Sequence, residues 1–326
     1  MIKAFVFGKF LPFHKGHEAM IKFALDQADF VSVLICRSNT EIIDANTRVK
    51  WIEASFRGVP NMEIRSMDYN EDMLPNSSVS SRPVSEAWSV IFRQLYPDYS
   101  IVITSEPYGA FIAEYMKIRH IIFDPAREFF PVSASAVRKN LQENWHFLTD
   151  AVKRDHLLKV VILGTESTGK TTLGKKLADH FGCNFVSEAG REIVQDSRKF
   201  EFSDLVRIAE EHAERIEKTE LTNSPLVMID TDIHITKSYA RFAFGRELIV
   251  GEHIYRANKA SLYLYLSNDA EYIQDGTRLN KESRDKLDTF HRQVLKDHHI
   301  NYVEISGDWS TRFEDAKTRI QKLLAH

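Results

Sequence analysis

The sequence predicts an α/β protein of two domains, each built on a parallel sheet flanked by helices. Three observations predict this class. The chain has 326 residues, which favours two domains over one. Short apolar runs alternate with longer amphipathic stretches, as strands alternate with helices in parallel sheets. The same alternation starts again at Lys159, after a polar and charged stretch over residues 140–157, so we expect domains at residues 1–150 and 151–326.

The elements of the first half follow from its apolar periodicity. Runs of four to nine mainly apolar residues predict strands, and the amphipathic stretches between them predict helices. The expected strands lie at residues 2–8, 30–38, 62–68, 101–106 and 120–125, and the expected helices at 17–28, 47–56 and 84–96. Because ligands collect at the carboxyl ends of parallel strands, we expect a site behind the first strand.

The second half has the same kind of pattern. Its expected strands lie at residues 159–164, 183–188, 225–230, 260–267 and 301–307. Its expected helices are an amphipathic one over 171–182, a long charged one over 203–221, and one at the end of the chain.

Composition and charge exclude several classes of protein. The formal net charge of −3 gives no general basic field for nucleic acid. Cys36 and Cys183 fit no zinc or disulfide pattern, which indicates a reducing cytoplasm. The N-terminus lacks the pattern of a signal peptide. No apolar stretch is close to the length of about 18 residues that a membrane span requires. We expect a cytoplasmic protein that is not membrane-embedded; its oligomeric state stays open.

The most specific motif is GTESTGKT, which follows the apolar strand over 160–163 and precedes a helix. This is the context in which a GxxxxGK[ST] motif binds the phosphates of ATP through backbone N–H groups. Lys170 is expected at the β and γ phosphates and Thr171 on Mg²⁺. The remaining candidate ATP-binding residues of this segment are Gly164, Thr165, Glu166, Ser167, Thr168, Gly169 and Thr172.

Acidic and basic residues elsewhere in the second half complete a candidate phosphoryl-transfer site. Asp230 ends an apolar strand and is a candidate Mg²⁺ ligand, with Asp232 as the fallback and a candidate substrate ligand. Glu188 is placed to accept a hydroxyl proton, with Arg191 three residues later. A surface ion pair is the alternative for these two.

Two arginines lie in the polar segment DGTRLNKESR. Arg278 and Arg284 are candidates for a lid that closes over the phosphates of ATP. A solvated run of charges is the alternative.

In the first half, GKFLPFHKGH follows the first strand and predicts an anion site. Its two histidines are three residues apart, with lysine and glycine between them, which disfavours a metal site of the HExxH kind. A helix that begins at this point would direct its free N–H groups at the same spot. The candidate ATP-binding residues are Gly8, Lys9, Phe10, His14 and His17.

A second helix start, VSASAVR, supplies Ser133, Ser135 and Arg138. Together, FLPFHKGH and VSASAVR resemble the [HT]xGH and [IV]SxxSxxR signatures of the nucleotidyltransferase superfamily. The resemblance implies transfer of an adenylyl group from ATP to a phosphate monoester. Such a phosphate is already ionised at pH 7, so positioning and cations suffice, and the catalytic candidates are Lys9, His14, His17 and Arg138.

Over essentially its full length the chain resembles the NadR-type nicotinamide-nucleotide adenylyltransferases and ribosylnicotinamide kinases. The resemblance also rests on TSEPYG, FDPAREFFPVSASAVR, NW and SEAGRE, where Gly190 departs from the usual EYARE. It implies ATP and Mg²⁺, with nicotinamide riboside as substrate, NMN as intermediate and NAD as product. Trp88, Tyr108 and Phe10 are candidates to stack on nicotinamide, and Glu106 is a candidate substrate ligand. The first strand begins too early for the helix-turn-helix of some members, so we expect no DNA binding.

Two alternatives remain. A phosphopantetheine adenylyltransferase joined to a dephospho-coenzyme A kinase would share the domain pairing, although its P-loop usually lacks the TES element. A regulator that senses nucleotides, with one inactive domain, would share the binding motifs.

Overall fold

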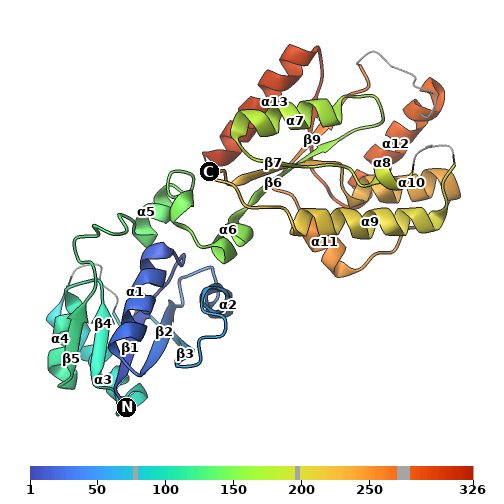
Figure 1. Cartoon of the computed structure of the whole chain (residues 1–326). Coiled ribbons are helices and arrows are strands. Elements are labelled where there is room, and N and C mark those ends of the chain that lie inside the picture. The colour runs from blue at the N-terminus through green and yellow to red at the C-terminus, as the bar shows by residue number, and fades with distance from the viewer. Residues whose placement is uncertain (76–79, 195–198, 270–279, 326) are drawn as a thin grey trace. The chain divides into compact units, whose positions relative to one another are not determined.

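The computed structural model describes residues 1–75, 80–194, 199–269 and 280–325. The chain divides into two compact units, Met1–Asp155 and His156–His326. Each unit contains one parallel sheet with helices packed around it, so the predicted fold class is confirmed (Figure 1). Within the described ranges, no helix combines the length and the apolar character needed to cross a bilayer.

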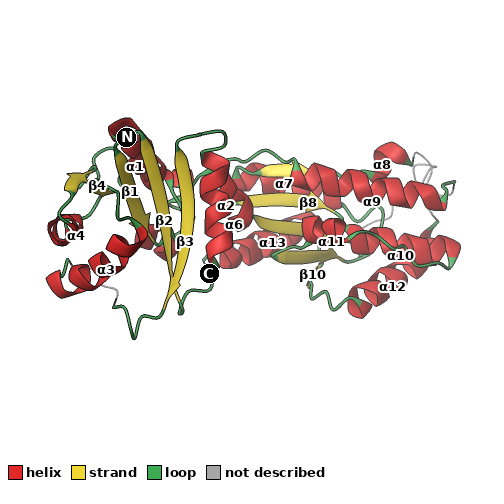
Figure 2. Cartoon of the chain, turned by 90° about the horizontal axis from the view of Figure 1, so that it is seen from below, coloured by secondary structure: helices red, strands yellow, loops and turns green. Residues whose placement is uncertain are grey.

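The sheet of the first unit has the strand order β3-β2-β1-β4-β5, and all its pairs are parallel. Figure 2 shows β1, β2 and β3 side by side. The chain runs from β1 to β2 on one side of it, and β4 lies on the other side, so the strand order reverses at β1. Ligands of open α/β sheets bind at such a reversal point. The strands are β1 (Lys3–Gly8), β2 (Phe30–Ser38), β3 (Met62–Tyr69), β4 (Ile101–Thr104) and β5 (Arg119–Ile122). The helices are α1 (Lys15–Gln27), α2 (Ala45–Ser55), α3 (Arg82–Leu95), α4 (Tyr108–Met116), α5 (Ala134–Lys139), the 3₁₀ turn η1 (Trp145–Phe147) and α6 (Asp150–His156).

The sheet of the second unit has the strand order β10-β9-β6-β8-β7, again with parallel pairs. The central strand β6 is the one that leads into the P-loop. The strands are β6 (Leu158–Leu163), β7 (Asn184–Val186), β8 (Leu226–Asp230), β9 (Leu262–Leu266) and β10 (Val303–Ile305). The helices are α7 (Lys170–Phe181), α8 (Gly190–Ile193), α9 (Phe202–Glu217), α10 (Ile233–Phe244), α11 (Glu252–Asn258), α12 (Lys281–Asp297) and α13 (Trp309–Leu324).

Strand β6 shows why this sheet is covered on both faces. Val160 and Ile162 pack with residues of α7 and α13, whereas Val161 and Leu163 pack with residues of α9, α10 and α12. Successive side chains of a strand point to opposite faces, so a continuous apolar run requires a helical layer on each side. All four side chains are fully buried. This packing fixes the end of β6, and with it the start of the phosphate-binding loop.

Candidate active sites

The P-loop runs from the end of β6 to the start of α7. Its backbone takes positive φ angles at Gly164 (137°), Ser167 (63°) and Gly169 (87°). At Gly169 a Cβ atom would also come within 2.0 Å of the ring of Trp309, so glycine is required there. Gly169 is the N-cap of α7 and has no side chain to satisfy the first-turn N–H groups. These groups are therefore available to an anion.

The P-loop side chains hold the loop in shape. Lys170 is 6% exposed, and its Nζ donates to the carbonyl of Thr165 at 2.9 Å. Thr168 Oγ1 donates to the same carbonyl at 2.8 Å. Glu166 accepts a hydrogen bond from the hydroxyl of Tyr239 at 3.2 Å. Ser167 lines the neighbouring cavity, whereas Thr172 is exposed on α7.

Arg312, on α13, braces the P-loop from behind. The guanidinium is 1% exposed and donates to the carbonyls of Thr168 at 2.8 Å, Gly307 at 2.8 Å and Ser267 at 3.0 Å. It also pairs with the carboxylate of Asp269. The sequence analysis does not identify this residue, because it lies 144 residues beyond Thr168 in the chain.

Asp230 and Thr171 meet at the carboxyl end of β8, as the sequence predicts for a metal side. Thr171 Oγ1 donates to Asp230 Oδ2 at 2.5 Å. Asp230 Oδ1 is buried and has no hydrogen-bond partner in the described part of the chain. A hydroxyl and a carboxylate oxygen at this position are hard ligands of the kind that Mg²⁺ binds.

Asp232 caps the N-terminus of α10 in this structure. Its Oδ1 caps α10 by accepting from the backbone N–H groups of His234 at 3.0 Å and Ile235 at 3.3 Å, and its Oδ2 lies 2.5 Å from His234 Nδ1. The side chain is fully buried. Because both carboxylate oxygens are engaged within the chain, Asp232 serves as a helix cap in this structure. Its role as a substrate or metal ligand stays a prediction.

A cavity of about 270 Å³ adjoins the P-loop. Its charged part is formed by Glu166, Lys170, Glu188 and Arg191, and the apolar part is lined by Val194, Phe200, Leu205, Ile208 and Ile235. Burial raises the pKa of Glu188, which the nearby charge of Lys170 opposes. Glu188 thus combines a raised pKa with a place at the phosphate end of a cavity, as a proton acceptor requires.

Glu188 and Arg191 also form the ion pair of the alternative interpretation, at 3.3 Å between a residue just before α8 and one in its first turn. Arg191 is 56% exposed and Glu188 22%. Gly190 lies between them, and a Cβ atom there would come within 3.3 Å of Glu188 Oε1. The departure from the family pattern therefore leaves more room around the Glu188 carboxylate.

Of the two arginines expected in a lid, Arg284 lies in α12 and is only 2% exposed, near Asp285. The amphipathic period of α12 turns this residue inward. Its role in binding the phosphates of ATP stays a prediction. Arg278 lies outside the described residues.

In the first unit, His14 and His17 stack at the start of α1, with ring centroids 3.7 Å apart. His14 is the N-cap, and its Nδ1 accepts from the backbone N–H of His17 at 3.4 Å. Burial, with a smaller contribution from Arg127, lowers the pKa of His14 to about 4. Burial, then the His14 and Arg127 charges, lowers the pKa of His17 well below its usual value. Both rings are therefore neutral here, not the cations that we expected.

The neutral ring of His14 has a defined tautomer. Its Nδ1 accepts, so Nε2 carries the proton. Within the described ranges, His14 Nε2 and His17 Nδ1 are buried without a partner. Two buried polar atoms at a helix start are thus available to a phosphate.

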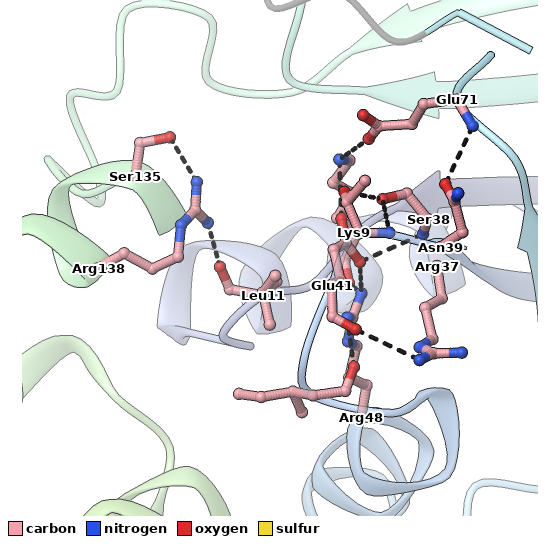
Figure 3. A network of polar contacts seen from close by, with 12 residues as sticks. Lys9, Leu11, Arg37, Ser38, Asn39, Glu41, Arg48, Glu71, Ser135 and Arg138 are labelled. Carbon is pink, nitrogen blue, oxygen red and sulfur yellow. Dashed lines mark hydrogen bonds and ion pairs between the residues drawn. The ribbon is translucent and has the colours of Figure 1, made fainter.

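Lys9, behind β1, belongs to a network of ion pairs (Figure 3). Its Nζ lies 2.7 Å from Glu41 and 3.2 Å from Glu71. Glu41 in turn lies 2.6 Å from the guanidinium of Arg48, which is fully buried and donates to the carbonyl of Lys9 at 2.9 Å. Gly8 is the last residue of β1. The sequence analysis names Lys9 but none of its three charged partners.

The two distant motifs of the first unit come together in space (Figure 3). Arg138 is exposed and donates to the backbone carbonyl of Leu11 and, at 3.1 Å, to Ser135 Oγ. Ser133 caps α5 by accepting from the backbone N–H of Ala136 at 3.1 Å. The second motif therefore lies against the first, as one binding site requires.

The aromatic candidates are packed more tightly than stacking on a ligand requires. Trp88 is 8% exposed and its Nε1 donates to the carbonyl of Pro75 at 3.0 Å. Phe10 is 2% exposed, and Tyr108 packs against Phe7. Trp88 and Phe10 therefore present little open surface in this structure, and their stacking on nicotinamide stays a prediction.

Glu106, the other candidate substrate ligand of the first unit, is held by Arg127. Arg127 pairs with its carboxylate at 2.6 Å and also donates to the carbonyl of Val132 at 3.3 Å. Arg127 lies in the quoted FDPAREFF stretch, but nothing in the pattern indicates that it faces the histidines.

Fold and sites define a two-domain nucleotide-binding protein, with a nucleotidyltransferase-type domain followed by a P-loop kinase-type domain. The cytidylyltransferase-like family matches residues 5–140, and the AAA domain family matches residues 159–312. Over nearly its whole length the chain is similar to NadR proteins. It is 27% identical, over 94% of its length and 80% of theirs, to the trifunctional NAD biosynthesis/regulator proteins NadR of Salmonella typhimurium (strain LT2) and Escherichia coli (strain K12).

Solved structures share the fold across both domains. A crystal structure of NadR protein in complex with NR matches 99% of this chain and 96% of that chain, with a TM-score of 0.74 and 20% identity. A NadR structure in complex with NAD and AMP-PNP matches with the same TM-score and identity.

Proposed function

We propose that the protein makes NAD from nicotinamide riboside in two steps, each using ATP. Residues 151–326 would phosphorylate the riboside to NMN, and residues 1–150 would join NMN to the adenylyl group of ATP and release pyrophosphate. The observation that carries the proposal is the cavity beside the P-loop, with Lys170 and Glu188 at one end and apolar side chains at the other. It suits a sugar hydroxyl at the phosphates and a flat ring beyond it. The names of the relatives support the same choice.

In the kinase step, Glu188 accepts the proton of the riboside hydroxyl as the hydroxyl oxygen bonds to the γ-phosphorus of ATP, and ADP leaves. Its raised pKa brings the carboxylate nearer to the range in which it accepts a proton well. Lys170 and the first-turn N–H groups of α7 stabilise the charge on the phosphates.

Thr171 and Asp230 would hold Mg²⁺ in this step. The unpartnered Asp230 Oδ1 and the neighbouring Thr171 hydroxyl fit such an ion. When bound, Mg²⁺ supplies charge that neutralises the phosphate oxygens.

In the adenylylation step, the phosphate of NMN attacks the α-phosphorus of ATP, and the bond to pyrophosphate breaks. The attacking phosphate is ionised, so the chain has only to align the groups and stabilise charge. Lys9 and Arg138 supply cations, and His14 supplies an N–H donor from Nε2. Because Glu41 and Glu71 hold Lys9 in the unliganded protein, phosphate must compete with these carboxylates for it.

The two steps can be tested separately in the full-length protein. With MgATP, nicotinamide riboside should give NMN and then NAD, detected by chromatography. Lys170→Ala should lower the kinase step by about 100-fold or more and leave NAD formation from added NMN intact. His17→Ala should do the reverse. If the folded wild type makes neither NMN nor NAD but adenylylates phosphopantetheine, the proposal is wrong.

We place the reaction in the cytoplasm. Its supply of ATP suits both steps, and its reducing conditions suit the free thiols of Cys36 and Cys183.

A further inference from the structure

His212 is a buried histidine on the cavity wall that the sequence analysis does not identify. It lies on α9, is 4% exposed, and its Nε2 is 3.3 Å from the carbonyl oxygen of Thr231. A carbonyl can only accept, so Nε2 carries the proton. Burial lowers the pKa of His212, which keeps the ring neutral. Nδ1 is therefore a bare acceptor.

Thr231, the partner of His212, has an unusual backbone. It follows the last residue of β8 and has a φ of 69°, in the left-handed region that β-branched residues rarely adopt. Its N–H donates to the carbonyl of Ile162 at 3.0 Å, and its carbonyl receives His212 Nε2. Both backbone groups of Thr231 are thus held, which keeps the side chain in one place beside Asp230. Strain of this kind collects at functional sites.

Two polar atoms of this pair lack partners. Within the described part of the chain, His212 Nδ1 and Thr231 Oγ1 are buried and make no hydrogen bond. Both residues line the cavity. Buried polar groups are almost always satisfied in native proteins, so a pair without partners in a binding cavity indicates that a ligand satisfies it.

The position of the pair indicates which part of the ligand it meets. Thr231 follows Asp230, so the pair lies at the reacting end, next to the hydroxyl that receives the phosphoryl group. The apolar wall around Phe200 and Leu205 remains for the base. The hydrogen-bond donors nearest to the reacting hydroxyl are the other hydroxyls of the same sugar, and these can donate to Nδ1 and pair with Oγ1.

We propose that His212 and Thr231 form the site that binds the ribose hydroxyls of the nucleoside and selects ribose over deoxyribose. This inference rests on the proposed riboside kinase activity and names the residues that determine its sugar specificity. His212 Nδ1 accepts from one hydroxyl, and Thr231 Oγ1 pairs with the same or the neighbouring hydroxyl. A substrate without one of these hydroxyls leaves at least one of the two buried atoms unsatisfied, which is the condition under which polar sites discriminate strongly.

The test compares nicotinamide riboside with its 2′-deoxy and 3′-deoxy analogues in the full-length protein. Thr231→Val keeps the β-branched shape and removes only the hydroxyl. His212→Phe keeps the ring and removes both nitrogens, whereas His212→Gln retains a donor and an acceptor. Thr289→Val, at an exposed position of α12, is the matched control.

We expect kcat/KM for the riboside to fall about 10-fold or more in Thr231→Val and His212→Phe, mainly through KM. The preference for riboside over one deoxy analogue should fall by the same factor, and His212→Gln should restore part of it. Adenylylation of NMN and the KM for ATP should stay unchanged, which reports an intact fold.

An unchanged preference in both Thr231→Val and His212→Phe, with the wild type active on the riboside, would overturn the inference and leave the kinase proposal standing. An equal loss on riboside and on both deoxy analogues would also overturn it, since that result indicates a purely structural role. A wild type that phosphorylates no riboside at all would instead remove the proposed function.

Discussion

Replacing Arg48 by methionine should destabilise the first unit strongly. Arg48 is fully buried and interacts with the Glu41 carboxylate at 2.6 Å and the carbonyls of Lys9 at 2.9 Å and Ile43 at 2.5 Å. Methionine fills much of the same volume but leaves Glu41, whose side chain is 7% exposed, with less positive charge. Removing one partner of a buried ion pair costs about 3–5 kcal/mol, and we expect a loss of this size.

The same structure predicts that a second substitution restores part of the stability. In the double variant Arg48→Met with Glu41→Leu no buried carboxylate remains, and well-packed apolar replacements of an ion pair are often close to neutral. The losses of unfolding free energy in the two single variants, added together, should therefore exceed the loss in the double variant by about 1.5 kcal/mol or more. Urea unfolding followed by tryptophan fluorescence measures this, because Trp51, Trp88 and Trp145 lie in the first unit and Trp309 alone in the second.

The two activities should also respond separately to the substitution in the first unit. Adenylylation of NMN should fall in Arg48→Met, because Lys9 loses a hydrogen bond at its carbonyl and the partner that positions Glu41. Riboside phosphorylation, measured in the same samples, is the internal control. Strict additivity of the two stability effects, or equal losses in both activities, would refute the reasoning.

Three further predictions follow from the structure. Arg312→Lys cannot reproduce the several hydrogen bonds of the planar guanidinium, so the KM for ATP in the kinase step should rise about 10-fold while NMN adenylylation is unchanged. Equal KM values in the variant and the wild type would contradict the role of Arg312 in holding the P-loop. Gly169→Ala should abolish riboside phosphorylation, and adding Trp309→Ala should rescue little of it because the positive φ of 87° remains; full rescue in a kinase assay would show that steric contact alone decides. The depressed pKa of His14, about 4 in the folded state against 6.5, should make the first unit lose about 3 kcal/mol as pH falls from 6.5 to 4, because the unfolded chain then binds the extra proton. His14→Asn should flatten that dependence in urea titrations at several pH values.

The local parts of the fold could be predicted from the sequence. The strand and helix positions follow from apolar periods of two and 3.6 residues, and both phosphate-binding motifs carry their local geometry with them. Lys170, Thr171 and Asp230 meet because each lies at a sequence position tied to a strand end. Asp230 and Asp232 could not be ranked as securely, because the backbone turn at Thr231 decides which carboxylate caps α10.

The partners of the site residues could not be predicted, because long-range contacts leave no local pattern. Glu41 and Arg48 resemble any surface pair of charges, and only the packing of α2 against β2 and β3 shows that both side chains are buried. The charge state of His14 and His17 also depends on burial, which the motif does not report. The burial of Arg284 and Trp88 could not be predicted for the same reason, since polarity and aromatic character do not reveal which face of a helix is covered.

The brace by Arg312 has a consequence for how the protein is made. The ribosome completes Thr168 long before it adds Arg312, which lies 144 residues later, and the ring that covers Gly169 comes from the same late helix. Until α13 emerges and docks, the nascent P-loop lacks the contacts that hold its shape. Nucleotide capture by the second unit should therefore be among the last properties that the growing chain acquires, whereas the first unit can fold and bind its ligands while synthesis continues.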